Sequence, residues 1–537
     1  MRRWNGWGDE TVDYPLPDPA AHYLETLIGP GVTTPDASFE EALACVPPSG
    51  LPPHPLVITD PAPRLLHARG HSLPDWVALR SGRLGTFPDG VAYPSSDDEV
   101  HQLLAFARQA PCRLIPYGGG TSVVGHINPL PDDRPALTVD LSRMHRLLDL
   151  DETSLLATFE AGVAGPDLEQ QLAGHGCTLG HFPQSFELST LGGWIATRSS
   201  GQQSLHYGRV EDHFAGGHLE TFLGGWDLPP HPASAAGPDL RHLVLGSEGR
   251  LGVITRAIVR VHRMPEAEGF FGIFFRDWAS GVAAVRSIVQ ADLAVSMLRL
   301  SDAQETETTL ALSGKEQLVA WADRGLRLLR YGADRCLLVY GVTGAAADMP
   351  PTRRSVEAIA RQNGGLPTGA MIGRIWRKSR FLTPYLRNTL WERGYAIDTL
   401  ETAVPWSAIP ETAASIKDVL RAGLHHEQER VLVFAHLSHV YRDGASVYVT
   451  YLFRRAADPD ATLARWTTLK SGASRAVVAQ GGTISHQHGV GLDHAPYLLA
   501  EKGRPGIDLI RLACQHMDPD GLLNPGKLLP PEGDKRP

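Results

Sequence analysis

The sequence lacks the features typical of secreted, membrane-spanning and nucleic-acid-binding proteins. Its 537 residues include five cysteines, none with the two-residue spacing of zinc and redox motifs, so we expect reduced thiols. The most apolar short run, GFFGIFF at 269–275, is far shorter than the roughly 18 residues of a membrane span. Fifty basic residues against 59 acidic ones give a net charge of −9, which argues against a nucleic-acid partner.

The first ten residues, MRRWNGWGDE, reach Asp9 and Glu10 before any apolar stretch, so we expect no signal peptide. By default we expect a cytoplasmic protein, with peripheral contact at a membrane left open. Glycine (55) and proline (41) are scattered without a period and 42% of residues are hydrophobic, which excludes collagen and disorder. At about 150 residues per domain, the length predicts three or four structural units.

The order of helical and strand patterns predicts an α+β protein. Residues 91–93 read as a strand, and Ser96 with Glu99 predicts a capping box at the start of an amphipathic helix. Other expected elements are strands at 113–115, 136–140, 155–159, 336–342, 431–437 and 447–453, and a helix at 166–174. Composition divides the chain into an N-terminal segment (1–85), a first domain (86–266), a second domain (267–480) and a C-terminal segment (481–537) that we expect to return to a site.

A glycine-rich loop follows the expected strand at 113–115. Its glycines would let backbone N–H groups approach an anionic group, while hydroxyls donate further bonds. The alternative is a tight turn without a ligand. A Rossmann site fits poorly because Val123 occupies the third glycine position and three nearby prolines leave no room for a helix. The residues of this candidate phosphate cradle are Pro116, Gly118, Gly119, Gly120, Thr121 and Ser122.

Two further glycine segments could line the same ligand. Ser189 and Thr190 precede Gly192, Gly193 and an expected helix at 194–197, an arrangement that could hold a diphosphate. The segment LGSEGRLGVIT at 245–255 precedes an alternating strand and, taken alone, predicts only a hairpin.

Four side chains stand out as candidates for chemistry. His486 and His488, two apart in SHQHGVG, should point to one side if the segment is extended. Tyr448 is either a plain strand residue or a phenol opening onto a cavity. Arg387 is either a solvated helix residue or a clamp for an anion.

Read together, these segments resemble flavoproteins of the vanillyl-alcohol-oxidase type, and among them the alkylglycerone-phosphate (alkyldihydroxyacetonephosphate) synthases of ether-lipid synthesis. The likeness extends over nearly the whole chain in the same order. The segments that carry it are RRWNGWGDE (2–10), PYGGGTSV (116–123), STLGGWIATRSSG (189–201), YGRVED (207–212), GPDLRHLVLGSEGRLGVIT (237–255), SHQHGVG (485–491) and MDPDGLLNPGKLL (517–529).

The resemblance implies an FAD-binding domain of the vanillyl-alcohol-oxidase (PCMH) type with an α/β cap domain that supplies the substrate pocket. It implies an enzyme that exchanges the acyl chain of acyl-dihydroxyacetone phosphate for a fatty alcohol. By motif, Tyr448 matches the catalytic tyrosine, Arg387 the phosphate-binding arginine, and His486 and His488 the outer two of three consecutive histidines. The resemblance also implies that the cradle residues above and Ser189, Thr190, Gly192 and Gly193 bind FAD. It adds further FAD-binding residues: Ser199, Gly201, Glu248, Gly249, Gly252, Val253 and Ile254.

Two departures keep alternatives open: Gln487 stands for the middle histidine, and Ala233 for an arginine of the family. The alternative is an FAD-dependent D-2-hydroxy-acid dehydrogenase or oxidase. Members of that class that bind a divalent metal use a glutamate where this chain has Gln487 and a histidine where it has Tyr448, so we predict no metal. A flavin-free scaffold would leave all three glycine segments idle. The expected partner is a small phosphorylated or hydroxy-acid substrate, with a lipid and a homodimer left open.

Overall fold

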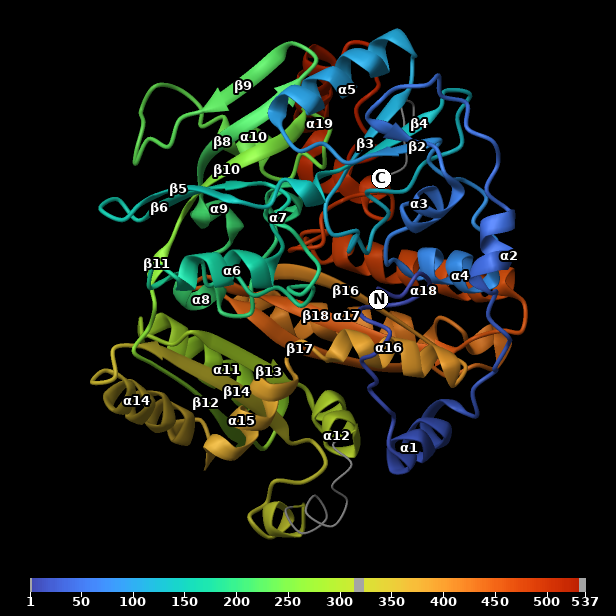
Figure 1. The fold of residues 1–537 in the computed structure, drawn as a ribbon. Coiled ribbons are helices and arrows are strands. Elements are labelled where there is room, and N and C mark those ends of the chain that lie inside the picture. Colours follow the sequence, from blue (N-terminus) through green and yellow to red (C-terminus); the bar gives the residue numbers. More distant parts are fainter. Residues whose placement is uncertain (1, 313–322, 531–537) are drawn as a thin grey trace.

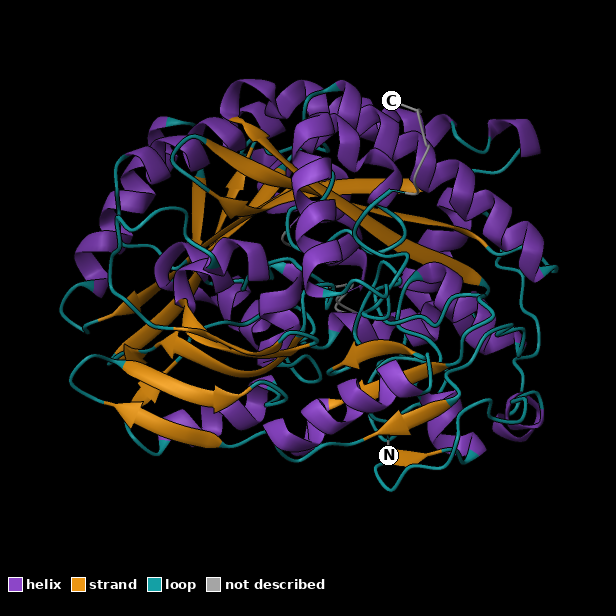
Figure 2. Ribbon diagram, turned by 90° about the horizontal axis from the view of Figure 1, so that it is seen from above, coloured by secondary structure: helices purple, strands orange, loops and turns teal. Residues whose placement is uncertain are grey.

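The computed structural model describes residues 2–312 and 323–530, in which strands form four sheets with helices between and outside them (Figure 1, Figure 2). The first sheet has the order β1 (Val57–Ile58), β2 (Gly90–Ala92), β4 (Ala136–Asp140), β3 (Arg113–Tyr117). The second has the order β5 (Leu147–Asp151), β6 (Leu156–Glu160), β10 (Val253–Arg260), β8 (Phe214–Thr221), β9 (Gly224–Leu228). A small third sheet pairs β11 (His262–Arg263) with β7 (Cys177–Thr178).

The fourth sheet is the largest and antiparallel throughout. Its order is β15 (Leu366–Gly369), β12 (Ala267–Phe275), β14 (Cys336–Gly344), β13 (Met297–Ser301), β17 (Leu432–Val440), β18 (Gly444–Arg454), β16 (Tyr395–Pro405). Its apolar core includes side chains of the helices α11 (Trp278–Gln290), α14 (Met349–Gln362), α17 (Ile409–Ala422) and α18 (Pro459–Ala479) as well as of the strands.

The helices of the first half are α1 (Asp18–Ile28), α2 (Phe39–Ala44), α3 (Pro61–Leu66), α4 (Leu73–Ser81), α5 (Asp97–Gln109), α6 (Gly165–Ala173), α7 (Leu191–Thr197), α8 (Ser204–Tyr207), α9 (Val210–His213) and α10 (Arg241–Val244). Those of the second half are α11 (Trp278–Gln290), α12 (Ala303–Leu312), α14 (Met349–Gln362), α15 (Ala370–Ser379), α16 (Thr383–Glu392), α17 (Ile409–Ala422), α18 (Pro459–Ala479) and α19 (Leu498–Met517). Among the described residues, no helix is both long and apolar enough to cross a bilayer.

The expected elements are present, and the differences lie at their ends. Only half of the predicted capping box forms at α5: Ser96 accepts the N–H of Glu99, but the Glu99 carboxylate bonds to Ser95 instead. Helix α7 begins at Leu191, three residues before the expected start, because the Thr190 side chain caps it by accepting the N–H of Gly193. The two glycines of this segment therefore lie inside the first turn.

The C-terminal segment returns to the first sheet. The N–H of Leu114 in β3 donates to Leu522 O, and the N–H of Asn524 donates to Leu114 O, both at 2.7 Å. Residues 522–524 thus run along β3 as a short parallel partner, which satisfies backbone groups at that edge of the sheet. In Figure 1 the red C-terminal residues reach the upper half of the molecule, where β3 lies.

The N-terminal residues pack against α16. The side-chain amide of Asn388 in α16 holds the backbone of Trp7 at both ends, accepting its N–H and donating to its carbonyl at 3.0 Å each. Both termini therefore contribute to the region between the sheets.

Candidate active site

A cavity of about 360 Å³ lies where the two halves of the chain and both terminal segments meet. Its walls come from the glycine loop after β3, from α7 and the residues before it, from the 248–254 segment, from α16, and from β16 and β18. The predicted site residues that line it are Pro116, Gly118, Gly119, Gly120, Thr121, Ser122, Ser189, Thr190, Gly192, Gly193, Ser199, Glu248, Gly249, Gly252, Ile254, Arg387, Tyr448 and His488.

The loop after β3 presents backbone donors to this cavity. The N–H groups of Gly119, Gly120 and Thr121 donate to no other residue in the described part of the chain. A Cβ on Gly119 would overlap the Leu188 carbonyl oxygen, and one on Gly118 would overlap the Thr190 hydroxyl. Two of the glycines are therefore needed to pack this loop against the second glycine segment, which leaves bare N–H groups in the wall.

The third segment ties the cradle to the C-terminal residues. Glu248 adopts a left-handed conformation at φ 53°, and its carboxylate accepts the N–H groups of Val490 and Gly491. Its carbonyl oxygen accepts the side-chain amide of Asn524 at 2.8 Å, which also donates to His126 O. Glu248 thus joins three distant segments at the cavity wall.

Two predicted cofactor residues are not among the lining residues of this cavity. Val253 is fully buried in the core shared by β4, α5 and the C-terminal segment, because alternate strand residues face opposite sides and Ile254 takes the cavity side. Gly201 packs against the backbone of Phe182. The remaining lining combines unpaired N–H donors with apolar walls from Trp194, Leu141 and Ile254, a combination that suits a diphosphate joined to aromatic rings.

The cavity wall also contains a buried cation. Arg387 of α16 lies over the Trp76 ring at 4.3 Å and donates from Nη1 to His71 O. Its Nε and Nη2 atoms are buried without a hydrogen-bond partner among the described residues. Burial lowers the pKa of Arg387 to about 10, so the side chain stays charged at neutral pH. A buried guanidinium with two free nitrogens is suited to pair with an anion entering the cavity.

Tyr448 and His488 lie in the same cavity. Tyr448 donates to Thr399 Oγ1 at 3.1 Å, stacks on His436 at 4.9 Å, and meets the His488 ring edge-on at 5.8 Å. Burial, together with the negative charge of Glu401, raises the pKa of Tyr448 well above its ordinary value. Burial also lowers the pKa of His488, so a neutral imidazole lies next to a protonated phenol at neutral pH.

The other predicted histidine lies elsewhere. His486 lines a second cavity of about 520 Å³, where its Nε2 is 2.6 Å from the Tyr441 hydroxyl and 3.1 Å from Arg209 Nη1. The expectation that His486 and His488 point to one side is therefore wrong, because the chain bends at residues 486–488 instead of running extended. Gln487 lines both cavities, and its Oε1 is buried without a hydrogen-bond partner in the described structure.

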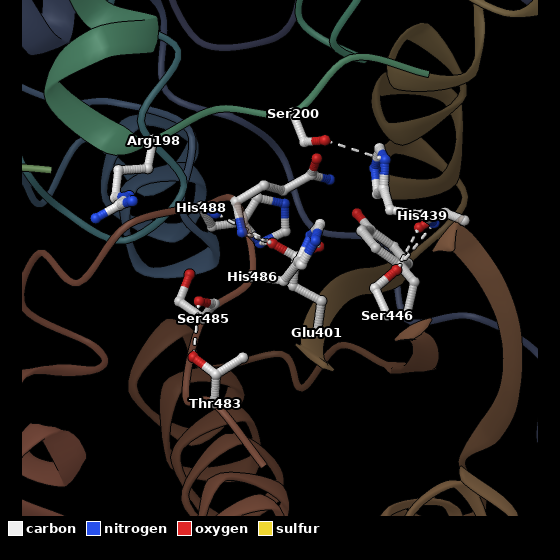
Figure 3. Close-up of polar contacts among 12 residues, drawn as sticks. Arg198, Ser200, Glu401, His439, Ser446, Thr483, Ser485, His486 and His488 are labelled. Atoms are coloured by element: carbon white, nitrogen blue, oxygen red, sulfur yellow. Dashed lines mark hydrogen bonds and ion pairs between the residues drawn. The ribbon is translucent and has the colours of Figure 1, made fainter. Parts of the chain in front are cut away.

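Several lining residues could not be found from local patterns. Trp7 belongs to the N-terminal segment, His71 precedes α4, and Asp398 and Thr399 lie on β16. The run RRWNGWGDE was the one available signal for Trp7, since it belonged to the segments that carry the resemblance. Glu401, which Figure 3 shows next to His486 and His488, lines neither cavity but was also not found from the sequence.

Comparisons with known proteins agree with this geometry. Residues 88–221 match the model of an FAD binding domain, and residues 264–528 match that of FAD linked oxidases, C-terminal domain. Alkyldihydroxyacetonephosphate synthase of Dictyostelium discoideum is 30% identical, with 98% of this chain and 93% of that protein covered.

Solved structures show the same relationship. A structure of an alkyldihydroxyacetonephosphate synthase superposes with a TM-score of 0.84 at 28% identity, covering 98% of this chain and 99% of that one. p-Cresol methylhydroxylase, 13% identical with a TM-score of 0.66 over 92% of this chain and 98% of that one, shares the fold. The predicted FAD-binding fold of the vanillyl-alcohol-oxidase type is thereby confirmed. This chain is an FAD-dependent enzyme and belongs to the alkyldihydroxyacetonephosphate synthase family of FAD-linked oxidases.

Proposed function

We propose that the protein exchanges the acyl chain of acyl-dihydroxyacetone phosphate for a fatty alcohol. The observation that carries the proposal is Arg387, a buried cation with two unpaired nitrogens, which lines the same cavity as Tyr448, His488 and the glycine cradle. A phosphate bound by Arg387 would hold a small substrate in the cavity that Tyr448 and His488 also line. When bound, FAD would supply an electrophilic ring for the substrate carbon at this place.

The protein's own groups would handle the protons. Deprotonated His488 would accept a proton from the substrate, since its imidazole is neutral in this environment. Tyr448, whose raised pKa keeps the phenol protonated, would donate to a substrate oxygen. Apolar walls from Trp7 and Trp194 would limit water, which competes with an alcohol as acceptor of the transferred group.

The cradle residues would hold FAD through different groups. Backbone N–H groups of Gly119, Gly120 and Thr121 would contact the diphosphate, and residues 248–254 would contact the remainder of the cofactor. Gly201 and Val253 act at most through their neighbours in this proposal, since neither lines the cavity.

The test is direct. Purified protein is incubated with acyl-dihydroxyacetone phosphate and a deuterated fatty alcohol, and mass spectrometry follows labelled alkyl-dihydroxyacetone phosphate and released fatty acid. We expect both products in equal amounts and no net reduction of an electron acceptor. Reduction of the flavin by D-lactate or D-2-hydroxyglutarate, without labelled product, would support the dehydrogenase alternative instead.

We also propose peripheral membrane contact, because fatty substrates partition into bilayers. Helix α15 supports this: Met371 and Ile375 are about half exposed, at 51% and 48%, next to the exposed basic side chains of Arg374 and Lys378. Basic amphipathic helices of this kind bind anionic lipid surfaces. Co-sedimentation with anionic vesicles should fall when Met371 and Ile375 are both changed to serine, and unchanged sedimentation would contradict this contact.

A further inference from the structure

Glu401 is a fully buried carboxylate outside the predicted site. It lies on β16 directly opposite Tyr448 of β18, which in turn lies opposite His436 of β17. Side chains that face each other across an antiparallel pair share one face of the sheet. The side chain of Glu401 has no exposed surface and lines neither cavity.

The carboxylate holds the bent histidine segment by its backbone. Glu401 Oε1 accepts the N–H of Gln487 at 2.6 Å and the N–H of His488 at 3.1 Å. Two successive backbone N–H groups that converge on one oxygen form a small anion-binding concavity, which stabilises the charge of a buried carboxylate. This contact explains the bend at residues 486–488, because consecutive N–H groups of an extended chain point in opposite directions.

The same carboxylate lies between the two imidazoles. Its Oε1 is 3.5 Å from His488 Nδ1 and its Oε2 is 3.8 Å from His486 Nδ1. The Oε2 atom and His486 Nδ1 are both buried without a hydrogen-bond partner in the described chain. Figure 3 shows Glu401 next to both His486 and His488.

We propose that Glu401 is the positioning residue of the reaction: it directs His488 into the cofactor cavity and supplies the negative charge that lets His488 take up a proton there. The chemical role of Glu401 rests on the proposed function, whereas the placement of His488 by Glu401 does not depend on it. It also accounts for Gln487, since a glutamine cannot exchange protons and the carboxylate beside His488 gives the neighbouring imidazole that role.

Some of the groups that face His488 raise the pKa of its imidazole and others lower it. Burial lowers its pKa most, and Lys470 of α18 and neighbouring His486 lower it further. Glu401 and Asp398, both on β16, act to raise it. Tyr448 of β18 meets the ring edge-on and stays neutral. Among these groups Glu401 is the carboxylate within 4 Å of the imidazole, so its removal should dominate any change.

The test uses Glu401→Gln in the FAD-loaded protein. The amide oxygen can still accept both N–H groups, so the segment keeps its bend while the charge disappears. Histidine-selective NMR, with His488 assigned from the spectrum of His488→Asn, should show its titration about 1–3 units lower in pH. The acid limb of the alkyl-transfer profile should move in the same direction, and kcat should fall at least tenfold with little change in KM.

Controls separate positioning from general damage. Glu429→Gln removes another buried carboxylate, which pairs with Arg454 and Arg465 away from the cavity, and should leave the His488 titration unchanged. Glu401→Asp keeps the negative charge on a shorter side chain, and the pH of its His488 titration should stay near that of the wild type. This second variant keeps the test valid if Glu401→Gln fails to bind FAD.

The outcomes are distinct. An unchanged His488 titration in Glu401→Gln, or an equal shift in Glu401→Asp, would overturn the positioning role. A different result would separate the two proposals: the His488 titration shifts in Glu401→Gln, but the wild-type protein itself makes no alkyl product. That result would support the placement of His488 by Glu401 and refute the proposed reaction.

Discussion

The two walls of the cavity are built in different ways. On the cradle side, residues 119–121 present backbone N–H groups, and Gly118 and Gly119 matter by being small enough for close packing. On the sheet side, Arg387, Tyr448 and His488 act through side chains that distant segments orient. A substitution that disturbs packing on the cradle side should therefore abolish cofactor binding altogether. A substitution on the sheet side should remove only the function of the side chain that is changed.

The largest effect should come from the cradle. Gly119→Val places side-chain atoms on the Leu188 carbonyl oxygen, so the loop cannot pack and its N–H groups leave the cavity wall. We expect protein without bound FAD, seen as loss of absorbance near 450 nm. Gly174→Val, at an exposed helix end, is the matched control and should stay yellow. Full FAD occupancy in Gly119→Val would show that this loop is not the cradle.

Tyr448→Phe should separate chemistry from binding. Removing the phenol, which we propose as the proton donor, should lower turnover by about 10²–10⁴-fold, with FAD content and the melting temperature close to the wild type. Tyr441→Phe removes a hydroxyl that contacts His486 in the second cavity and should cost far less turnover. A Tyr448→Phe enzyme within threefold of the wild type would make this tyrosine a structural strand residue.

Arg387→Lys should weaken anion binding. A lysine cannot make the two parallel bonds of a guanidinium, so we expect KM for the phosphorylated substrate to rise about 10- to 100-fold. Arg455→Lys is a close control, because Arg455 is also buried over a tryptophan, at 4.2 Å from Trp391, but outside the cavity. Equal changes in KM for the two variants would remove Arg387 from the binding site.

Acid should weaken both halves of the molecule through buried histidines. Burial lowers the pKa of His213, at the end of α9, to about 4, and that of His494, which contacts the carbonyl oxygen of Gly489, to about 3. Below the unfolded value near 6.5 the unfolded chain takes up protons that the folded protein refuses. The free energy of unfolding should therefore fall by about 1.4 kcal/mol per histidine for each unit by which the pH drops below 6.5, until the pH reaches the pKa of the folded state.

Urea unfolding at pH 7.0 and 5.5 measures this loss. His213→Gln should reduce the dependence on pH even if it lowers stability at pH 7, since the glutamine does not titrate. The same slope in the variant and the wild type would mean that His213 does not contribute.

The smallest effect concerns the residue between the two histidines. Gln487→His restores the family's imidazole at a position that lines both cavities, and the proposed reaction predicts equal or higher alkyl transfer. The measurement is the rate of labelled alkyl product, with Gln487→Leu as a control that fills the same space without hydrogen bonds. Loss of alkyl transfer in Gln487→His would indicate that the glutamine shapes the pocket for a different substrate.

The difference between the walls also explains what the sequence could predict. The glycine segments were identified because turns, caps and bare backbone are properties of a few neighbouring residues. The role of Glu401 was not, because β16 and the 485–491 segment meet only through tertiary pairing, and a lone glutamate in a strand pattern resembles any other. The prediction that His486 and His488 point to one side was wrong for a related reason, because a spacing of two residues places side chains on one side only in an extended chain.

The bond between Asn524 and His126, 398 residues apart in the chain, has a consequence for how the protein is made. At about 5–20 residues per second, a ribosome needs roughly 20–80 s between these two positions. Throughout that time the strand that carries the cradle lacks its neighbour at 522–524, and the wall that Asn524 and Glu248 share does not exist. FAD should therefore load only after synthesis is nearly complete, and chains stalled earlier should accumulate without flavin, with the edge of β3 exposed to aggregation.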